Sequence, residues 1–278
     1  MSLDKNPWSH FRDLSPKTEE QTDDRPADST VRERTEKAGS VRRLEDLPVE
    51  EVNLKPASRI AYVTEPRSLG ADRFRFLRMG LREGWSAGKL RKLLVTSPLP
   101  GDGKSTVTLN LGAVLAEHGQ RSVLLVEADL YHASLSPQLG LETKPGLTEC
   151  LEGRLNPLAA VRRLQPMDVY FMSAGRLKSN STELLQSQAL SDVFAQLSPH
   201  FDWVVIDSPP VIPVSDALSL RQEADASLLV VRAGSTPSQA VEHALALLGR
   251  KHVLGIVFNG VEGLDRLYSK SYKDYYAK

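Results

Sequence analysis

A short segment with two glycines, a lysine and a serine is the part of this chain best suited to chemistry. Gly101 and Gly103 allow the backbone of P-G-D-G-K-S-T to curl so that its N–H groups point inward. A helix beginning near Lys104 would add its positive N-terminal end. The Lys104 ammonium suits the β- and γ-phosphates of a nucleotide, and the Ser105 hydroxyl suits Mg²⁺. The segment therefore predicts a nucleotide phosphate site.

The context of this segment supports the prediction, although its pattern is incomplete. The apolar run L-L-V-T precedes the loop and an amphipathic stretch follows it directly. A phosphate cradle requires this layout of strand, loop and helix. Pro98 stands where the first glycine of G-x-x-x-x-G-K-[ST] would fall. The alternative is a glycine-rich turn that precedes a helix by chance.

Carboxylates end two further apolar runs. Asp207 closes W-V-V-I-D, and Glu127 and Asp129 close S-V-L-L-V-E-A-D. Open α/β sheets bind ligands at the carboxyl ends of their strands, so we expect these acids beside the phosphate site. Asp207 would hold a metal-bound water, and the other two would supply metal positioning and a general base. The alternatives are a loop or helix-capping aspartate at 207 and an acidic loop that only caps a helix at 127–129.

Tyrosines are concentrated at the end of the chain. Four of the seven lie in the last eleven residues, at Tyr268, Tyr272, Tyr275 and Tyr276. Accessible hydroxyls are suitable phosphoacceptors, and because tyrosine has a pKa of about 10, their phosphorylation needs a carboxylate that accepts the hydroxyl proton. The alternative is an aromatic stripe packed on the core, because the four positions also fit one face of a helix.

The elements that must position these residues follow from the apolar pattern between Leu93 and Phe258. Near-continuous runs of Val, Leu and Ile separated by helices indicate a parallel sheet covered on both faces. We therefore expect an α/β fold with a mostly parallel sheet. The expected strands are 93–96, 123–126, 169–172, 203–206, 227–231 and 253–258, and the expected helices are 105–118, 183–197, 216–223 and 238–249.

The two ends of the chain differ from this central region. Residues 1–58 contain ten Lys or Arg and thirteen Asp or Glu with few large apolar side chains, so we expect a disordered arm. Residues 59–260 would form the catalytic domain, in which Phe74, Leu77 and Leu81 indicate a helix within 59–90. Residues 261–278 would form a mobile, tyrosine-rich tail.

Composition excludes several classes of protein. The 278 residues are 41% hydrophobic and 25% charged, which suits a globular chain, and 35 basic residues balance 35 acidic ones. Zero formal charge gives no global attraction to nucleic acid, so no nucleic-acid partner is expected. A single cysteine, Cys150, fits a reducing cytoplasm, and no stretch approaches the ~20 apolar residues of a membrane span.

Together these features resemble the bacterial tyrosine kinase family of capsular and exopolysaccharide systems, in its separate cytoplasmic form of the CpsD and CapB type. The similarity runs from about Arg59 to the C-terminus. It implies a P-loop NTPase-like fold and the use of ATP and Mg²⁺. By position, it implies nucleotide contacts at Pro100, Gly101, Asp102, Gly103, Lys104, Ser105, Thr106 and Asn259, metal contacts at Ser105, Asp207 and Glu127, and catalytic roles for Lys104, Asp129, Glu127 and Asp207.

The resemblance also implies partners. The stretch D-R-F-R-F-L-R resembles the family's E-x-x-R-x-x-R helix, which implies that Asp72, Arg75 and Arg78 contact a neighbouring protomer in a ring. One subunit's tail would then be phosphorylated in the next subunit's active site. A membrane-embedded polysaccharide co-polymerase would activate the kinase and recruit it to the inner face of the cell membrane, where it would control polymerisation or export.

The sequence departs from the family pattern at the second acidic motif. Glu127 stands where aspartate is usual, and Tyr131 and His132 follow where a basic residue is usual, so turnover is expected to be low. One alternative is therefore a nucleotide-binding regulatory subunit without catalysis. Another is a switch ATPase of the ParA and MinD class, which is disfavoured because its signature lysine would fall at Leu99.

Overall fold

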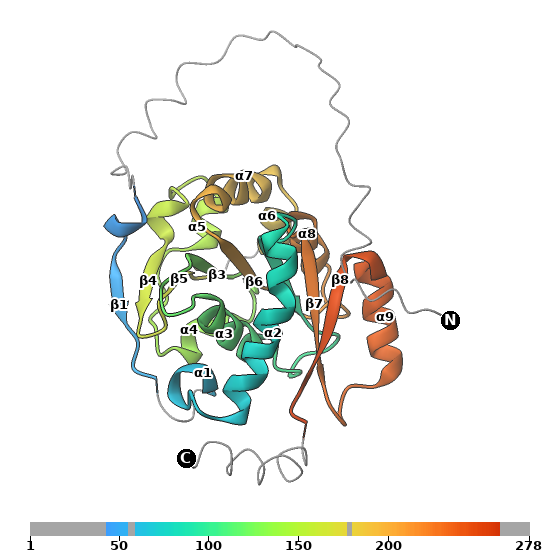
Figure 1. Ribbon diagram of the computed structural model, residues 1–278. Helices are drawn as coiled ribbons and strands as arrows, with labels where there is room; N and C mark the ends of the chain where they lie inside the picture. The colour runs from blue at the N-terminus through green and yellow to red at the C-terminus, as the bar shows by residue number, and fades with distance from the viewer. Residues whose placement is uncertain (1–42, 55–58, 177–179, 262–278) are drawn as a thin grey trace.

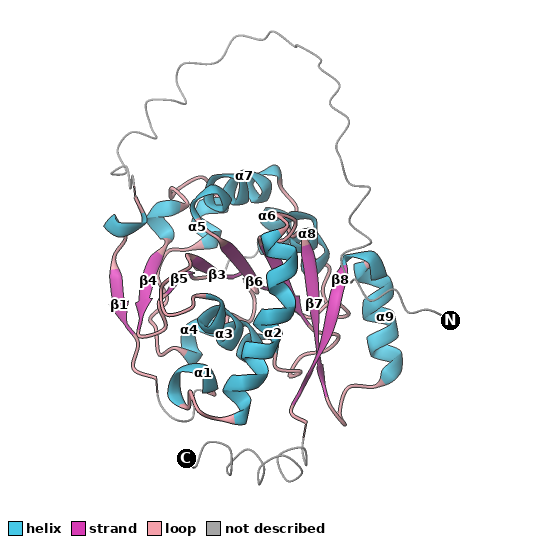
Figure 2. Cartoon of the chain, viewed as in Figure 1, coloured by secondary structure: helices cyan, strands magenta, loops and turns pink. Residues whose placement is uncertain are grey.

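The computed structural model describes residues 43–54, 59–176 and 180–261. These residues form an eight-stranded sheet between two layers of helices (Figures 1 and 2). The strands lie in the order β1-β4-β5-β3-β6-β2-β7-β8. Their bounds are β1 Val49–Glu51, β2 Lys92–Thr96, β3 Val123–Glu127, β4 Arg162–Gln165, β5 Val169–Met172, β6 Trp203–Asp207, β7 Ala226–Arg232 and β8 Val253–Asn259.

Each face of the sheet carries its own helices. The first face packs α1 Ala61–Thr64, α2 Leu69–Ser86, α3 Lys104–Leu115 and α4 Leu135–Gln138. The second face packs α5 Leu147–Leu151, α6 Ser181–Leu185, α7 Gln188–Leu197, α8 Asp216–Glu223 and α9 Ser238–Leu248. Short 3₁₀ turns are η3 Leu44–Asp46, η5 Leu158–Ala160, η6 Ser198–His200 and η7 Arg250–His252.

The pairing of strands makes this sheet mostly parallel, as the sequence predicts. From β5 to β8 all neighbours are parallel, and the antiparallel pair is β4 with β5, so β1 and β4, parallel to each other at one edge, run opposite to the other six. Leu93 and Val95 of β2 enter the core on the α3 side, whereas Leu94 enters the core on the opposite side. Because both faces of the strand are buried, its sequence is a continuous apolar run. The predicted α/β fold is confirmed.

Two expected helices end or break earlier than their apolar pattern indicates. Helix α3 ends at Leu115, because Glu117 and His118 adopt left-handed backbone conformations, with φ of 49° and 56°. The expected helix 183–197 is two helices, because Ser187 between α6 and α7 is extended, with φ −85° and ψ 160°. Helix α2 follows the predicted stripe, with Leu81 buried and Phe74 and Leu77 partly buried against the core.

Part of the expected disordered arm is folded. Residues 43–54 include β1, which pairs with β4 at the edge of the sheet. Leu47 and Val52 are buried in the two cores, and the Glu50 carboxylate lies 3.0 Å from Arg162 Nε. The boundary expected at residue 58 is therefore wrong, because a few apolar side chains and the ion pairs of Glu50 with Arg162 and Lys144 are enough to hold an edge strand. Residues 1–42 and the tail tyrosines lie outside the described residues.

Strand β4 has no apolar signature that could have predicted it. Its first residue, Arg162, is buried, and its guanidinium lies 5.2 Å from the centre of the Phe171 ring. A buried arginine that stacks on an aromatic ring and pairs with an acid replaces the usual apolar side chain.

Within the described part of the chain, no helix is both long and apolar enough to cross a bilayer.

Candidate nucleotide site

The loop between β2 and α3 has the backbone that its glycines predict. Gly101 and Gly103 have φ of 85° and 94°, in the left-handed region that glycine adopts without strain. A Cβ atom on Gly103 would lie 1.9 Å from Asn259 Nδ2, so no other residue fits there. Gly103 also precedes the first turn of α3 and has no side chain to cap it. The N–H groups of that turn are therefore left for a ligand.

The loop is held in place by the ends of β7 and β8. Asp102 is 4% exposed, and its Oδ1 accepts a hydrogen bond from Thr236 Oγ1 at 2.6 Å. Asn259 Nδ2 donates to the Asp102 carbonyl at 3.0 Å, and Arg232 Nη1 donates to the Gly101 carbonyl at 3.2 Å. These contacts fix the curled backbone before any ligand binds, which lowers the ordering cost of binding.

Asp207 lies beneath the start of α3 and is fully buried. Its Oδ2 accepts a hydrogen bond from Ser105 Oγ at 3.0 Å, and its Oδ1 accepts one from Thr108 Oγ1 at 3.1 Å. Burial raises the pKa of Asp207 to about 6, although Lys104 and the two hydroxyl donors oppose the shift. Two hydroxyl donors and the Lys104 charge compensate this buried carboxylate only in part, as expected of a group that also binds a cation when the ligand is present.

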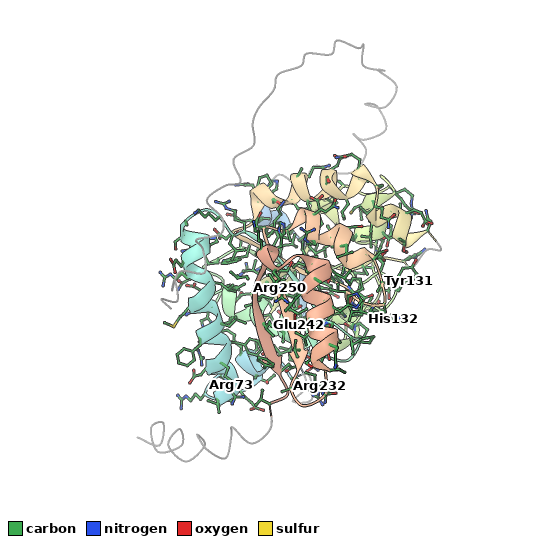
Figure 3. All side chains as sticks on the ribbon, turned by 90° about the vertical axis from the view of Figure 1, so that its right-hand side faces the viewer. Arg73, Tyr131, His132, Arg232, Glu242 and Arg250 are labelled. Carbon is green, nitrogen blue, oxygen red and sulfur yellow. The ribbon has the colours of Figure 1, made fainter. Side chains whose placement is uncertain are left out.

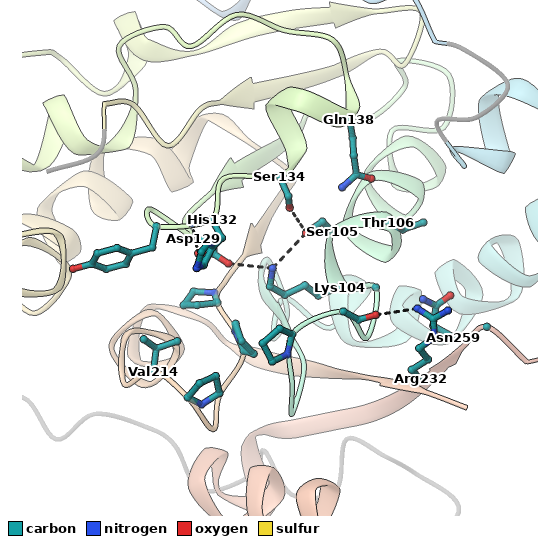
Figure 4. Close-up of a pocket in the computed structure, with 18 of the residues that line it drawn as sticks. Lys104, Ser105, Thr106, Asp129, His132, Ser134, Gln138, Val214, Arg232 and Asn259 are labelled. Carbon is teal, nitrogen blue, oxygen red and sulfur yellow. Dashed lines mark hydrogen bonds and ion pairs between the residues drawn. The ribbon is translucent and has the colours of Figure 1, made fainter. Parts of the chain in front are cut away.

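Lys104 and Asp129 form an ion pair at the base of the cleft (Figure 4). Lys104 Nζ lies 3.1 Å from Asp129 Oδ2, and the carboxylate is 2% exposed. Asp129 Oδ1 accepts a hydrogen bond from the His132 backbone N–H at 3.0 Å. Oδ2 accepts no hydrogen bond from the described residues. That oxygen is therefore available to accept a proton once Lys104 forms its ion pair with a bound phosphate instead.

Glu127 has a different environment from the other two acids. Its Oε1 accepts hydrogen bonds from the backbone N–H groups of Leu135, at 2.7 Å, and Ser136, at 3.0 Å. Its Oε2 accepts from Ser136 Oγ at 2.6 Å and from the Ala174 N–H at 3.3 Å. Four donors fill the lone-pair sites of one carboxylate. Glu127 therefore joins α4 and the end of β5 to β3, and its expected metal and catalytic roles lose their geometric support.

The cleft above these residues has a volume of about 850 Å³, within the range of small-molecule sites. Of the residues expected to contact the nucleotide, all line it except Asp102, whose side chain points into the loop anchor. Five further polar residues of the wall, which no sequence motif indicates, are Arg59, Ser134, Gln138, Thr182 and Arg232, and Tyr131 and His132 also line it. Two of the five contact the predicted set directly: Ser134 Oγ lies 2.6 Å from Ser105 Oγ, and Arg232 donates to the Gly101 carbonyl. None of the five belongs to a motif, because they come from several different loops and element ends.

Tyr131 occupies the wall of the cleft where the family pattern has a basic residue. Its hydroxyl lies 3.3 Å from Thr182 Oγ1, and the side chain is 40% exposed. Figure 3 shows Tyr131 next to His132, far across the molecule from Arg73 of α2. The substitution therefore places a neutral aromatic ring at this side of the cleft.

The residues expected at an oligomer interface lie together on α2 and do not line the cleft. Arg75 Nη1 is 2.6 Å from Asp72 Oδ1, and Arg75 Nη2 donates to the Pro66 carbonyl at 2.8 Å. Arg78 Nη1 is 3.5 Å from the Val114 carbonyl oxygen. In the single chain these side chains are engaged within their own protomer, and contact with a neighbour stays a prediction.

The site fits a magnesium-bound nucleotide. Gly103 supplies the left-handed backbone of the loop, the buried Asp129 Oδ2 accepts no hydrogen bond from the described residues, and Asp207 and Ser105 present oxygen ligands to one point. In the described part of the chain no group of three metal-binding side chains is present. That agrees with Mg²⁺, which is usually held by one or two protein oxygens together with substrate phosphates.

The fold and this loop define a P-loop NTPase. Residues 90–263 match the ParA family model, which is described as an NUBPL iron-transfer P-loop NTPase. Tyrosine-protein kinase YwqD of Bacillus subtilis is 31% identical over 200 residues, covering 71% of this chain and 84% of that protein. The kinase domain of the Escherichia coli tyrosine kinase ETK superposes with a TM-score of 0.69 at 26% identity, over 73% of this chain and 80% of that one.

The chain belongs to the bacterial tyrosine kinase family of capsular and exopolysaccharide systems. The resemblance drawn from the sequence is thereby confirmed. The succinoglycan biosynthesis transport protein ExoP of Rhizobium meliloti is 32% identical over 227 residues, which cover 80% of this chain and 28% of ExoP. The chain therefore spans most of the length of YwqD but less than a third of this longer relative.

Proposed function

We propose that this chain is an ATP-dependent protein-tyrosine kinase that phosphorylates Tyr268, Tyr272, Tyr275 and Tyr276 of a neighbouring subunit. The observation that carries the proposal is the meeting of Lys104, Asp129 and the Ser105–Asp207 pair at the base of one cleft. The four tyrosines lie outside the described residues. Their role rests on the sequence, which places them at the chain end among lysines and serines.

The nucleotide half of the site has a role for each residue. Magnesium-bound ATP supplies the phosphoryl group and a Lewis acid that neutralises its charge. The N–H groups of residues 101–106 and the α3 terminus bind the phosphates, and Lys104 stabilises charge on the transferred group. Ser105 and Asp207 would hold the metal. Asn259, at the end of β8, would contact the base.

The acceptor half of the site depends on one carboxylate. Asp129 Oδ2, which faces Lys104, accepts the proton from the incoming tyrosine hydroxyl. Its Oδ1 is fixed by the His132 N–H, so the carboxylate has a defined orientation. Glu127 has no such free oxygen, because both of its oxygens are hydrogen-bonded to α4 and to the end of β5. We assign the general base to Asp129 alone.

The family suggests how this reaction is used. The α2 residues Asp72, Arg75 and Arg78 would bind the next protomer of a ring, and a membrane-embedded polysaccharide co-polymerase would recruit the ring to the inner face of the membrane. Each phosphotyrosine adds up to about two negative charges, so phosphorylated tails would repel one another and loosen the ring. That cycle would regulate the polymerisation or export of a capsular polysaccharide or exopolysaccharide.

Mass spectrometry of the tail after incubation with Mg²⁺ and ATP tests the proposal. Wild-type chain is expected to gain phosphate on residues 268–276, and Lys104→Met is expected to gain none. Lys89→Met is the matched control, because Lys89 is exposed and does not line the cleft. Nucleotide binding without any phosphotyrosine, even with the co-polymerase fragment present, would instead identify a non-catalytic regulatory subunit.

A further inference from the structure

The cleft contains a cation that the proposed reaction does not use. Lys104 is paired with Asp129, and Arg232 donates to the Gly101 carbonyl. Arg59 also lines the cleft, is exposed, and has a guanidinium without a hydrogen bond or ion pair to any described residue. A nucleotide triphosphate carries several negative charges, and a free arginine at the wall of its site is suited to bind them.

The backbone of Arg59 is held in an unusual conformation. Its φ is 58°, in the left-handed region that favours glycine, so arginine is not the residue that the backbone itself prefers. Its carbonyl accepts a hydrogen bond from Asn110 Nδ2 at 2.9 Å. Asn110 is 1% exposed and lies on α3, where the same Nδ2 also donates to the Thr106 carbonyl. The helix that begins at the phosphate loop therefore fixes where Arg59 enters the cleft.

We propose that Arg59 is a further phosphate-binding residue of the nucleotide site, supplied by the segment before α1 and positioned by Asn110. The inference rests on the proposed nucleotide site and extends it to a part of the chain outside the loop and strand-end motifs. Strained backbone conformations are concentrated at functional sites, and the function inferred for Arg59 is to place a positive charge beside bound phosphate.

The same contacts connect the cleft to α2. The Tyr62 N–H, three residues beyond Arg59, donates to Asn110 Oδ1 at 3.3 Å. The guanidinium of Arg75 lies 5.2 Å from the centre of the Tyr62 ring, and Arg75 pairs with Asp72. A phosphate held by Arg59 is thereby tied to the helix that carries the expected interface residues.

Binding measurements on the full chain test this inference without requiring activity. ATP, ADP and adenosine would be titrated with Mg²⁺ into wild type, Arg59→Gly and Arg59→Lys. Arg59→Gly is expected to weaken ATP binding roughly 5- to 20-fold, Arg59→Lys roughly 2- to 5-fold, and neither is expected to change the affinity for adenosine. Arg91→Met, an exposed arginine that does not line the cleft, is the control and should bind as wild type does.

The glycine variant also separates binding from folding. Glycine relieves the left-handed backbone, so Arg59→Gly should melt no lower than wild type. Equal ATP affinity in Arg59→Gly and wild type would overturn the inference, as would an equal loss of affinity for ATP and adenosine. If the wild type binds ATP but forms no phosphotyrosine, the kinase proposal fails while this inference stands.

Discussion

Two carboxylates at the ends of adjacent strands show how differently one edge of the sheet can use an acid. Glu127 of β3 and Asp207 of β6 are paired in register, and both are buried. Glu127 accepts four hydrogen bonds, three of them from backbone N–H groups, whereas Asp207 accepts two from hydroxyls and has a raised pKa. The first acid stabilises the fold, and the second stays incompletely compensated for a ligand.

Asp129 adds a third case within the same strand-and-loop segment. It lies two residues after Glu127, yet among the described residues its Oδ2 has the Lys104 ammonium as its one polar partner. The difference arises because the chain turns away from the sheet after β3, which brings Asp129 over the phosphate loop and leaves Glu127 beneath α4. Two acids separated by a single residue therefore have different environments: Glu127 is fully hydrogen-bonded within the fold, and Asp129 faces the proposed nucleotide site.

The largest expected effect follows from removing the charge of Asp129. Asp129→Asn should lower the rate of tyrosine phosphorylation by roughly 10²- to 10⁴-fold, because the hydroxyl proton loses its acceptor. Initial rates of phosphotyrosine formation at saturating Mg-ATP measure it, with Asp192→Asn, at an aspartate that does not line the cleft, as control. A rate within a few-fold of wild type would remove Asp129 from the role of base.

The matched change at Glu127 should act on the fold and spare the chemistry. Glu127→Gln replaces an acceptor-only carboxylate with an amide whose NH₂ group faces donors, so the unfolding free energy should fall by about 1–3 kcal/mol. Urea unfolding measures the loss, and the phosphorylation rate of the folded fraction should stay near that of wild type. A lower phosphorylation rate with an unchanged unfolding free energy would instead show that Glu127 acts in the reaction.

A smaller effect on stability is expected at Asp207, with the opposite sign. Its pKa is raised from 3.8 to about 6, so the native state holds a proton that the unfolded state releases between about pH 4 and pH 6. Unfolding free energy therefore falls as pH rises through that window. Asp207→Asn removes this dependence and should be the more stable protein at pH 8 by about 1–2 kcal/mol, after the altered hydrogen bonds are allowed for.

Urea unfolding of Asp207→Asn and wild type at pH 4 and pH 8, without nucleotide, measures the effect. The difference in unfolding free energy between the two proteins should grow with pH. If the difference in unfolding free energy is the same at pH 4 and pH 8, the buried Asp207 carboxylate does not destabilise the native state.

The smallest expected effect concerns the anchor of the phosphate loop. Thr236→Val removes the hydrogen bond to Asp102 Oδ1 and the one that Thr236 Oγ1 accepts from the Arg232 N–H, so the curled loop must be ordered partly by the ligand. Affinity for ATP should fall roughly 3- to 10-fold, as expected for one hydrogen bond to a charged group. Titration of Thr236→Val and of Thr236→Ser, which keeps the donor, separates the lost hydrogen bond from altered packing. Equal weakening in both variants would assign the effect to packing.

Sequence reasoning succeeded where local pattern decides the structure. The strand before the phosphate loop, the glycines at 101 and 103, and the acid closing β6 all follow from short contiguous runs. It could not predict the surroundings of Glu127, whose donors include a hydroxyl 9 residues away and a backbone N–H 47 residues away. It also missed Arg59, because only the fold brings the segment before α1 to the wall of the cleft. Burial and donor geometry are long-range properties, and they decide which acid is free.

Calorimetric titration of Mg-ATP into the full chain and into Lys104→Met tests the central claim most directly. The account predicts saturable, one-to-one binding by wild type and binding at least tenfold weaker by Lys104→Met, as expected when a charge-assisted phosphate contact is lost. Lys89→Met should bind as wild type does. A wild-type chain that takes up no Mg-ATP, or a Lys104→Met variant that binds it equally well, would contradict the assignment of this cleft.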